Sequence, residues 1–469
     1  MAVIKFGTDG WRDLMYDQFN LPNVRRVVRA IAKYVIDKGG IERGVVVGYD
    51  ARFFSDFFAN EAAKILTGYG IKVLLGERDY PTPVVAFAVK HYNAFGAVMF
   101  TASHNPPEYN GIKFIPEYAG PATQDITAAI EANLSAVADD DHGIADPGLI
   151  EKFNPTIPYL EQLNKIVNVK KIVDSGLNIF IDPMFATGRG FLKELLKGCN
   201  VIELHNYRDP LFGGSMPDPQ GQFLTELKQK VMETPNSIGL AMDGDADRFG
   251  IIDSDGTYLT PNQVITLLLA HLIKNRAQQG VAVRSVATTH MIDKLGKMFG
   301  VETIETPVGF KYIGEKMRTH QVIIGGEESG GLSIIGHIPE KDGILACALM
   351  AELRAVSQKP LLETLQELYQ ELGNFYTKRI DLHLDEAIKQ QILTKVKTIF
   401  PGKIGTKTIS EARTIDGFKF ILENNSWFLV RPSGTEPLIR IYFEAQSVAD
   451  LEYLTDQVQQ MVEQWSKTA

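Results

Sequence analysis

The sequence predicts an α/β protein with three related α/β domains and a smaller C-terminal α+β domain around a central cleft. Short, continuous apolar runs alternate with helical patterns over most of the chain, which is typical of sheets covered on both faces. Three of these runs lead directly into polar loops, at residues 101–111, 243–248 and 325–331. Because ligands of open α/β sheets bind at the carboxyl ends of strands, we expect these loops to face one cleft.

The individual elements follow from apolar runs and helical spacing. Six runs are expected to form buried strands: Val45–Val47, Val73–Leu75, Ala97–Phe100, Ile179–Ile181, Ile238–Met242 and Val322–Ile324. The spacing predicts helices over 24–36 and 263–273. Near the C-terminus we expect strands at 427–430 and 439–443, then a helix with Ser447 as its N-cap and Asp450 three residues later. The predicted domains are 1–152, 153–255, 256–371 and 372–469.

Composition limits the classes of protein that this chain can represent. Its 469 residues exceed what one hydrophobic core can organise. A net charge of −9 argues against a general nucleic-acid binder, so any phosphate site needs local basic residues. Cys199 and Cys347 form no disulfide framework, and no apolar stretch is long enough for a membrane span. We expect a cytoplasmic protein that binds neither nucleic acid nor membrane.

Ser103 lies in a loop suited to a nucleophile. The loop follows a buried strand, and two prolines at 106 and 107 stiffen its exit. A rigid loop that presents one hydroxyl suits covalent catalysis, and Lys113 could return beside this hydroxyl to stabilise negative charge. Adjacent side chains usually point apart, so we expect His104 to contact phosphate or support the site rather than act as the base for Ser103. Taken alone, the segment is equally compatible with an ordinary turn.

Asp243, Asp245 and Asp247 alternate with small residues directly after a predicted strand, and Arg248 follows them. Small spacers let the backbone curl so that three carboxylates face one point. Hard oxygen ligands at this density suit Mg²⁺ or Mn²⁺, and without a cation they would repel one another. The pattern therefore predicts a divalent metal site, with a solvated acidic turn as the alternative.

Two other functions are compatible with an acidic loop. An EF-hand calcium loop needs Gly at its sixth position and Glu at its twelfth, where this chain has Arg248 and Ser254. A phosphatase could use Asp243 as an aspartyl nucleophile. The third aspartate and the arginine fit metal and phosphate binding better. A phosphoserine survives acid, whereas an aspartyl phosphate is labile in both acid and base, so the two are separable by experiment.

Glu327 and Ser329 lie in the segment GGEESGG, where a carboxylate beside a hydroxyl can recognise vicinal sugar hydroxyls. A flexible turn with solvated glutamates explains this segment equally well when it is taken alone. Arg12, at the end of FGTDGWR, and Lys311, in TPVGFK, lie in similar turns. Each could face the site or satisfy a group in the core.

The segment RPSGTEP, with Arg440 after it, has the composition of a phosphate site. Gly434 allows successive N–H groups to point at one anion, and Ser433 and Thr435 add hydroxyl donors. Arg431 can offer a bidentate fork to phosphate oxygens. A β-turn with surface arginines is the alternative.

Taken together, FGTDGWR, TASHNPPEYNGIKF, DGDADR, TPVGFK, GGEESGG and RPSGTEP resemble the motifs of the α-D-phosphohexomutase family. The motifs extend from residue 6 to residue 440, which is nearly the whole chain. The order of TASHNP, DGDADR and RPSGTEP is a very specific combination. The resemblance implies four domains around a deep cleft and a phosphoserine enzyme that requires Mg²⁺.

The resemblance also implies a role for each candidate residue. The phosphorylated serine is Ser103, which completes a Mg²⁺ site with Asp243, Asp245 and Asp247. The residues around the transferring phosphoryl group are Arg12, His104, Lys113 and Arg248. The residues that contact the sugar are Lys311, Glu327 and Ser329. The residues that bind the non-reacting phosphate are Arg431, Ser433, Gly434, Thr435 and Arg440. Lys113, Lys311 and Arg12 are all candidates for the general base.

The implied reaction transfers a phosphoryl group from phospho-Ser103 to a hexose phosphate. A hexose 1,6-bisphosphate forms, turns over in the cleft and returns its other phosphoryl group to Ser103, and closure of the fourth domain is expected to retain it. The expected binding partner is thus a small substrate, a hexose phosphate, with glucose 1,6-bisphosphate as activator and intermediate. The protein is expected to be a monomer or homodimer.

The sugar segment favours glucose phosphate as the substrate. Glucosamine-specific relatives usually carry Gln in place of Glu328 and a His near the end of this loop, and dual mannose/glucose members often carry His where this chain has Gly331. Phosphomannomutase or dual activity is the alternative, and phosphoglucosamine mutase is a more distant one.

Overall fold

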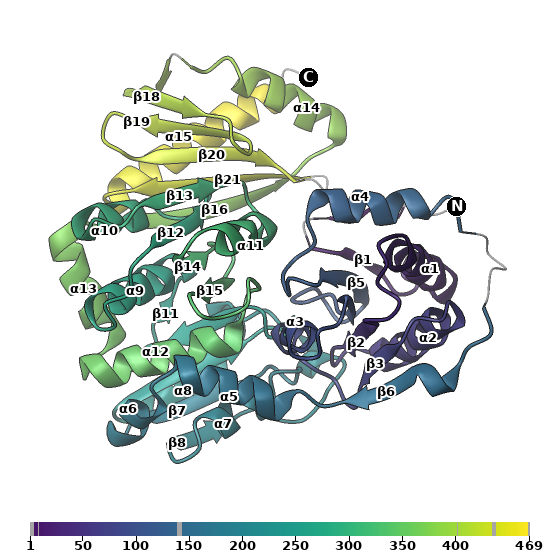
Figure 1. Cartoon of the computed structure of the whole chain (residues 1–469). Coiled ribbons are helices and arrows are strands. Elements are labelled where there is room, and N and C mark those ends of the chain that lie inside the picture. Colours follow the sequence, from purple (N-terminus) through teal and green to yellow (C-terminus); the bar gives the residue numbers. More distant parts are fainter. Residues whose placement is uncertain (1–3, 8, 138–142, 401, 434–437, 468–469) are drawn as a thin grey trace. The chain divides into compact units, whose positions relative to one another are not determined.

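The computed structural model describes residues 4–7, 9–137, 143–400, 402–433 and 438–467 (Figure 1). The chain forms two compact units. The first contains residues 1–281 and 309–362, and the second contains residues 282–308 and 363–469. No helix among the described residues is both long and apolar enough to cross a membrane.

The first unit begins with a six-stranded sheet in the order β1-β5-β4-β2-β3-β6. Its elements are β1 (Trp11–Leu14), α1 (Leu21–Asp37), β2 (Val45–Tyr49), α2 (Ser55–Gly68), β3 (Val73–Gly76), α3 (Thr82–His91), β4 (Gly96–Phe100), β5 (Tyr109–Pro116), α4 (Gln124–Asn133) and β6 (Ile150–Phe153). β2 pairs in parallel with β3 and β4, and α1 and α2 contribute to the core that buries the sheet. The loop with Ser103 connects β4 to its antiparallel neighbour β5.

A five-stranded sheet follows in the order β11-β10-β9-β7-β8. The elements of this region are α5 (Thr156–Ile166), α6 (Val169–Asp174), β7 (Asn178–Asp182), α7 (Phe191–Leu195), β8 (Asn200–Glu203), α8 (Thr225–Met232), β9 (Ser237–Met242), β10 (Phe249–Ile252) and β11 (Tyr258–Leu259). The fully buried strand β9 pairs in parallel with β7 and antiparallel with β10. The acidic segment 243–248 is therefore the turn of a hairpin, which rules out the helix-flanked arrangement of an EF-hand.

The third region again alternates helices and strands. Its elements in the first unit are α9 (Pro261–Lys274), α11 (Phe310–Thr319), β14 (Val322–Gly326), β15 (Leu332–Ile334) and α12 (Gly343–Ser357). The predicted helix over 263–273 begins earlier, at Pro261, because Thr260 and Gln263 form a capping box and proline is favoured in the first turn. β14 pairs antiparallel with β15, and the sugar segment forms the turn between them.

The second unit contains the rest of the third region and the C-terminal domain. Its elements are β12 (Val281–Ser285), α10 (Met291–Phe299), β13 (Thr303–Thr306), α13 (Leu361–Leu372), β16 (Tyr376–His383), α14 (Glu386–Val396), β17 (Lys403–Ile404), β18 (Lys407–Arg413), β19 (Phe418–Leu422), β20 (Trp427–Pro432), β21 (Leu438–Ala445) and α15 (Val448–Lys467). β12 and β13 are parallel, whereas β16 to β21 form an antiparallel sheet in the order β16-β21-β20-β19-β18-β17.

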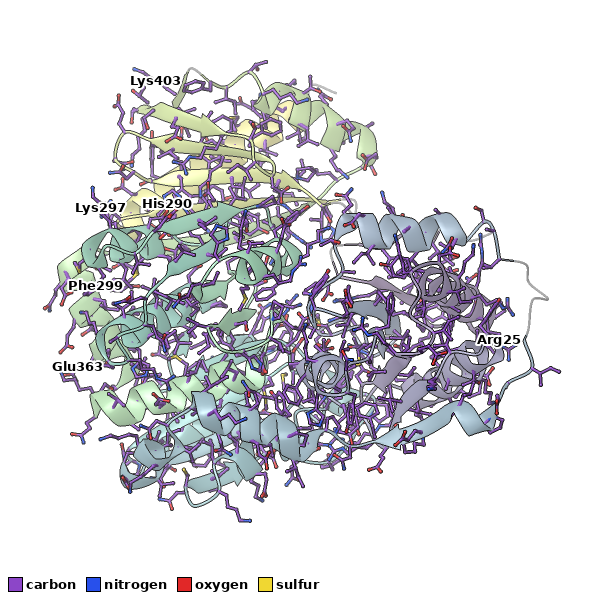
Figure 2. All side chains as sticks on the ribbon, viewed as in Figure 1. Arg25, His290, Lys297, Phe299, Glu363 and Lys403 are labelled. Carbon is purple, nitrogen blue, oxygen red and sulfur yellow. The ribbon has the colours of Figure 1, made fainter. Side chains whose placement is uncertain are left out.

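Helices α14 and α15 bury their apolar faces in the core of the antiparallel sheet. Ser447 caps α15 as predicted, because its Oγ accepts a hydrogen bond of 3.1 Å from the Asp450 N–H. A smaller core surrounds Trp427, whose ring lies 5.4 Å from that of His290, labelled in Figure 2. Three α/β regions and a smaller α+β region confirm the predicted fold class.

Candidate active site

The Ser103 hydroxyl is fixed in a buried turn. Ser103 is only 1% exposed and has a left-handed backbone, with φ of +51°. Its N–H donates to Thr101 Oγ1 at 2.8 Å, and its Oγ donates to Asp243 Oδ2 at 2.6 Å. The structure therefore brings the predicted nucleophile into direct contact with the predicted metal loop.

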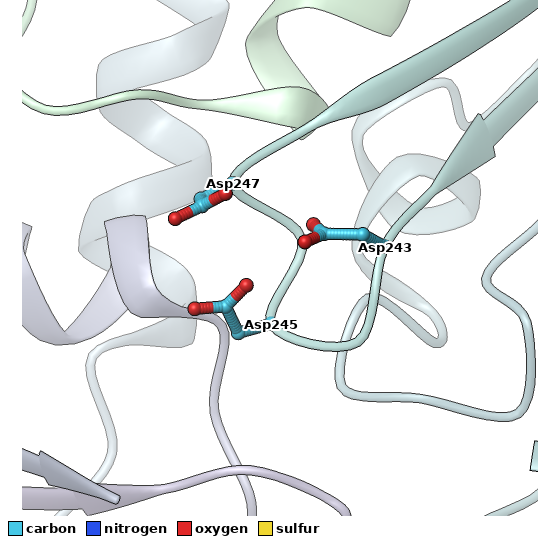
Figure 3. Close-up of side chains that lie close together, drawn as sticks. All are labelled: Asp243, Asp245 and Asp247. Atoms are coloured by element: carbon cyan, nitrogen blue, oxygen red, sulfur yellow. The ribbon is translucent and has the colours of Figure 1, made fainter. Parts of the chain in front are cut away.

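Asp243, Asp245 and Asp247 are fully buried, and one oxygen from each lies within 4.8 Å of the others. Figure 3 shows the three side chains lying close together on the hairpin loop. Gly244 makes this approach possible, because a Cβ at this position would meet the Ser103 carbonyl oxygen at 2.3 Å. The acidic loop and the nucleophile loop can come this close only with glycine here.

The Oδ2 atoms of Asp245 and Asp247 are bonded to other side chains of the protein. Asp245 Oδ2 accepts from Thr82 Oγ1 at 2.6 Å and from Lys113 Nζ at 2.9 Å. Asp247 Oδ2 lies 3.0 Å from Lys113 Nζ and 2.8 Å from Lys341 Nζ. The Oδ1 atoms of Asp245 and Asp247 are buried and have no hydrogen-bond partner among the described residues. A carboxylate with one oxygen anchored and one free is oriented for a further ligand.

The electrostatics of the acidic loop also favour a cation. Burial first, and the charges of Asp245 and Asp247 next, raise the pKa of Asp243 well above its usual value. At Asp245, burial acts in the same direction, but Lys113 and Lys341 outweigh it and lower the pKa. The repulsion between Asp243 and the other two carboxylates is thus not compensated by the protein, and a bound divalent ion would remove this repulsion. The donors, all oxygen, fit a hard cation such as Mg²⁺.

Lys113 lies in a buried cluster of carboxylates. Its ammonium is 2.9 Å from Asp9, 2.9 Å from Asp245 and 3.0 Å from Asp247. The reason is electrostatic, because a buried ammonium is most stable among several carboxylates. Although burial would lower the pKa of Lys113, Asp245, Asp247 and Asp9 raise it well above its usual value.

Sequence reasoning missed three members of this cluster. Lys341 Nζ contacts Asp9 Oδ2 at 3.1 Å as well as Asp247, and Thr82 supports Asp245. Asp9 lies in the FGTDGWR motif but was assigned no role. Lys341 could have been found from the charged run Glu340-Lys341-Asp342 directly before the apolar helix α12. Thr82 has no comparable signal in the sequence.

The His104 side chain lies close to the nucleophile. Its Nδ1 is 3.3 Å from Ser103 Oγ, so the premise that the two side chains point apart is wrong. Ser103 has a left-handed backbone, which the sequence does not specify. Desolvation first, then Arg248 and Arg12, lower the pKa of His104 well below its usual value, which keeps the imidazole neutral near pH 7.

Two arginines flank the nucleophile loop and the metal loop. Arg12 Nη1 donates to Asn105 Oδ1 at 3.0 Å and to the Ala102 carbonyl at 3.3 Å. The backbone N–H of Arg248 donates to Asp243 Oδ1 at 2.9 Å. Arg12 therefore bonds to the nucleophile loop through its side chain, and Arg248 closes the metal loop through its backbone N–H.

The sugar segment lies in the same unit. Glu327 is 5% exposed, and its Oε1 accepts a hydrogen bond of 2.7 Å from the Gly309 N–H. Burial first, then the charge of Glu328, raise the pKa of Glu327 to about 7. Ser329 and Lys311 are half-buried, and Lys311 Nζ lies 5.2 Å from the centre of the Tyr312 ring.

The predicted phosphate residues lie in the second unit. Arg431 on β20 pairs in register with Arg440 on β21, so both belong to the same end of the hairpin. Arg431 Nε donates to Asp416 Oδ2 at 2.8 Å, and the Ser433 N–H donates to the Leu438 carbonyl at 3.0 Å. Gly434 and Thr435 lie outside the described residues.

The chain matches four consecutive domains of one family. These are the "Phosphoglucomutase/phosphomannomutase" alpha/beta/alpha domains I (residues 3–140), II (157–256) and III (260–372) and the C-terminal domain (380–461). The chain therefore belongs to the phosphoglucomutase/phosphomannomutase family of α-D-phosphohexomutases, whose members are mutases.

Similar proteins carry several substrate names. A crystal structure from Thermus thermophilus, named provisionally as a phosphomannomutase, is 33% identical with a TM-score of 0.87, over 98% of this chain and 99% of that one. A phosphoglucomutase of Komagataeibacter xylinus is 29% identical over 98% of this chain and 90% of its own length. A phosphoglucosamine/phosphogalactosamine mutase of Sulfurisphaera tokodaii is 28% identical over 98% of this chain and 99% of its own length.

Proposed function

We propose that the protein interconverts glucose 1-phosphate and glucose 6-phosphate through phospho-Ser103 and a glucose 1,6-bisphosphate intermediate. The observation that carries this proposal is the hydrogen bond of 2.6 Å between Ser103 Oγ and Asp243 within a buried triad of aspartates. A nucleophile directly at a divalent metal site is the arrangement that phosphoryl transfer requires.

Asp243, Asp245 and Asp247 would hold Mg²⁺, together with an oxygen of Ser103 or of its phosphate. When bound, the ion supplies positive charge to the transferring phosphoryl group and to the Ser103 oxygen. The anchored Oδ2 atoms of Asp245 and Asp247 fix the direction of the two remaining Oδ1 atoms. The chain therefore supplies a preformed set of ligands.

Positive charge around Ser103 comes from the protein as well. Arg12 donates from its side chain to the nucleophile loop, and the charge of Arg248 acts on both Asp243 and His104, so we propose that both arginines neutralise phosphate oxygens. When the phosphoryl group leaves Ser103, the serine oxygen must receive a proton, and the sugar hydroxyl that is attacked must lose one. A neutral His104, 3.3 Å from Ser103 Oγ, is placed to hold the phosphoserine oxygen by a hydrogen bond.

The C-terminal domain is proposed to bind the phosphate that is not reacting. Arg431, Ser433, Gly434, Thr435 and Arg440 are the candidates, since the two arginines share one end of the β20–β21 hairpin. Arginine offers the planar fork that phosphate oxygens accept. Closure of this domain over the bisphosphate belongs to the same proposal, because the intermediate must turn over without escaping.

The choice of glucose rests on the sugar segment. Glu327 and Ser329 are the proposed contacts for the sugar hydroxyls, and Lys311 is a proposed substrate contact. Gly331 leaves room for Lys341, because a Cβ at residue 331 would lie 2.5 Å from Lys341 Cδ. A larger residue, such as the His of dual-specificity members, would displace this lysine. Mannose phosphate and, less closely, glucosamine phosphate are the alternative substrates.

The deciding experiment compares turnover of the 1-phosphates of glucose, mannose and glucosamine, each with its catalytic bisphosphate and Mg²⁺. We expect the largest kcat/KM with glucose 1-phosphate, and a larger value with either other sugar would contradict the assignment. Release of inorganic phosphate without isomerisation would instead favour a phosphatase. Full activity of Ser103→Ala would eliminate the phosphoserine mechanism.

A further inference from the structure

Arg52 is a buried cation beside the nucleophile loop, and neither the sequence motifs nor the proposed mechanism gives it a role. It follows β2 in the segment Asp50-Ala51-Arg52, and its side chain is fully buried. A buried guanidinium is costly unless its donors are bonded. The identity of its partners therefore indicates what the residue does.

Four of these partners are carbonyl groups of the loop that carries Ser103. Nη2 of Arg52 donates to the carbonyls of Ser103 and Asn105, both at 2.6 Å. Nη1 donates to the carbonyls of Pro106 at 2.7 Å and Tyr109 at 3.1 Å. One planar group thus binds the nucleophile's own carbonyl and three further carbonyls within the next six residues.

Arg52 is itself held in place from several sides. Its Nε lies 3.2 Å from Asp50 Oδ2, and Asp50 is in turn fixed by hydrogen bonds of 2.8 Å from Ser55 and 2.9 Å from the Arg52 N–H. The guanidinium carbon lies 5.0 Å from the centre of the Phe212 ring. Arg208 donates to the carbonyls of Ala51 and Arg52 at 3.1 and 3.2 Å. Because these contacts leave the guanidinium little freedom, it can serve as a rigid template.

We propose that Arg52 is a positioning residue for Ser103: its guanidinium gathers the carbonyls of the loop 103–109 and so holds the Ser103 hydroxyl at Asp243. The role follows from the backbone of Ser103. A left-handed serine is unfavourable by itself and persists only where its surroundings determine it. Lysine could preserve the charge, but its single ammonium cannot bind four carbonyls in one plane. The proposal rests on the proposed role of Ser103 as the phosphoryl carrier.

The test is Arg52→Lys, measured as kcat and KM for glucose 1-phosphate and as the rate at which glucose 1,6-bisphosphate phosphorylates dephosphorylated Ser103, followed by intact-protein mass. We expect kcat and the phosphorylation rate to fall together by about 10- to 100-fold, with KM changed by less than about 3-fold, because misplacement of a nucleophile by about 1 Å has this effect. An unfolded fraction would also lower the apparent kcat at unchanged KM, but it would lower only the amplitude of Ser103 phosphorylation and not the rate constant in the folded molecules.

The matched control is Arg276→Lys. Arg276 also bonds a carboxylate and a carbonyl, those of Glu352 and Ile166, in the same unit, but contacts neither active-site loop. We expect Arg276→Lys to lower the melting temperature and to leave kcat and the phosphorylation rate unchanged. Wild-type kcat and phosphorylation rate in a folded Arg52→Lys protein would overturn the proposal.

If Arg52→Lys does not fold, Arg52→Gln decides the question, because it removes the buried charge and its amide can bond at most two of the four carbonyls. A fall in kcat and phosphorylation rate at constant KM supports the proposal, and unchanged values overturn it. Ser103→Ala is assayed alongside. An active Ser103→Ala protein would refute the phosphoserine mechanism itself, whereas an inactive Ser103→Ala with a fully active Arg52→Lys would refute only the role of Arg52.

Discussion

Each unit of the protein contains a cluster of charged side chains built around buried cations, and the two clusters differ in how completely they are bonded. The cluster of the first unit comprises Asp9, Lys113, Asp245, Asp247 and Lys341. The cluster of the second unit comprises Arg284, Asp293, Glu305, Arg413 and Lys419. Only the first lies against a candidate nucleophile in the same unit.

In the second cluster, every carboxylate oxygen is occupied by a cation. Both oxygens of Asp293 accept from Arg284, at 2.6 and 2.8 Å. Glu305 Oε1 accepts from Arg284 and Lys419, and its Oε2 accepts from Arg413. The first cluster instead leaves one buried oxygen on each of Asp245 and Asp247 without a partner among the described residues. A fully bonded cluster stabilises a fold, whereas orphaned buried oxygens indicate a place for a ligand.

Removal of the divalent ion is the strongest test of this difference. We expect chelation by EDTA to abolish mutase turnover and added Mg²⁺ to restore it, because the ion neutralises charge on the transferring phosphate. Added Mg²⁺ should also raise the melting temperature, since a ligand that binds only the native state stabilises it. Turnover that persists after exhaustive chelation would contradict the assignment of Asp243, Asp245 and Asp247 as a metal site.

Substitution of one aspartate in each cluster sharpens the comparison. We expect Asp245→Asn to lower kcat by a factor on the order of 10² to 10³, as is typical when a group that stabilises transition-state charge is lost. Asp293→Asn should lower the melting temperature and leave kcat near its wild-type value. Equal losses of kcat in the two variants would show that the clusters do not differ in function.

Substitution of Gly331 should have a smaller effect on activity than loss of the metal ion or of an aspartate. Gly331→His should displace the Lys341 ammonium from Asp9 and Asp247, because even a Cβ at this position meets Lys341 Cδ at 2.5 Å. Overpacking of this kind lowers stability by about 1–3 kcal/mol, so we expect a lower melting temperature. We also expect a lower kcat/KM, because the displaced ammonium no longer balances the charge of Asp247. Gly336→Ala is the control, since nothing lies within 4 Å of a Cβ there; the left-handed backbone of Gly336 makes a small loss of stability expected, without a loss of kcat/KM.

The cluster of the second unit should affect how the stability of the protein depends on pH. Burial first, then Arg284, lower the pKa of Lys419 from 10.5 to about 7 in the folded protein. Between these two pH values the unfolded chain binds more protons than the native protein, so the free energy of unfolding rises with pH across this window. Lys419→Met should lack that rise. Urea denaturation at pH 7, 8 and 9 measures it, and parallel wild-type and mutant curves would contradict the prediction.

The sequence predicts local structure well where one short segment contains the whole cause. The strand before Asp243 is a continuous apolar run that is buried on both faces, and Ser447 caps its helix through a bond to a residue three positions away. The grouping of the three aspartates follows from their spacing in one hairpin turn. The premise that the side chains of Ser103 and His104 point apart was wrong, because it depended on a backbone angle at Ser103 that the sequence does not specify. The carboxylate partners of Lys113 could not be predicted either, because they come from segments far apart in the chain.

The amino-acid sequence by itself determined the alternation of strands and helices and the grouping of the three aspartates, because these depend on apolar periodicity and on residues close in the chain. The candidate nucleophile was identified through the resemblance of its motif to those of a known family. Only the tertiary structure decided that Asp9 and Lys341 meet Asp247, that Lys113 binds three carboxylates, and that Arg52 binds the nucleophile loop. Such contacts join residues from different strands and helices, and electrostatic and steric complementarity in the folded core selects them.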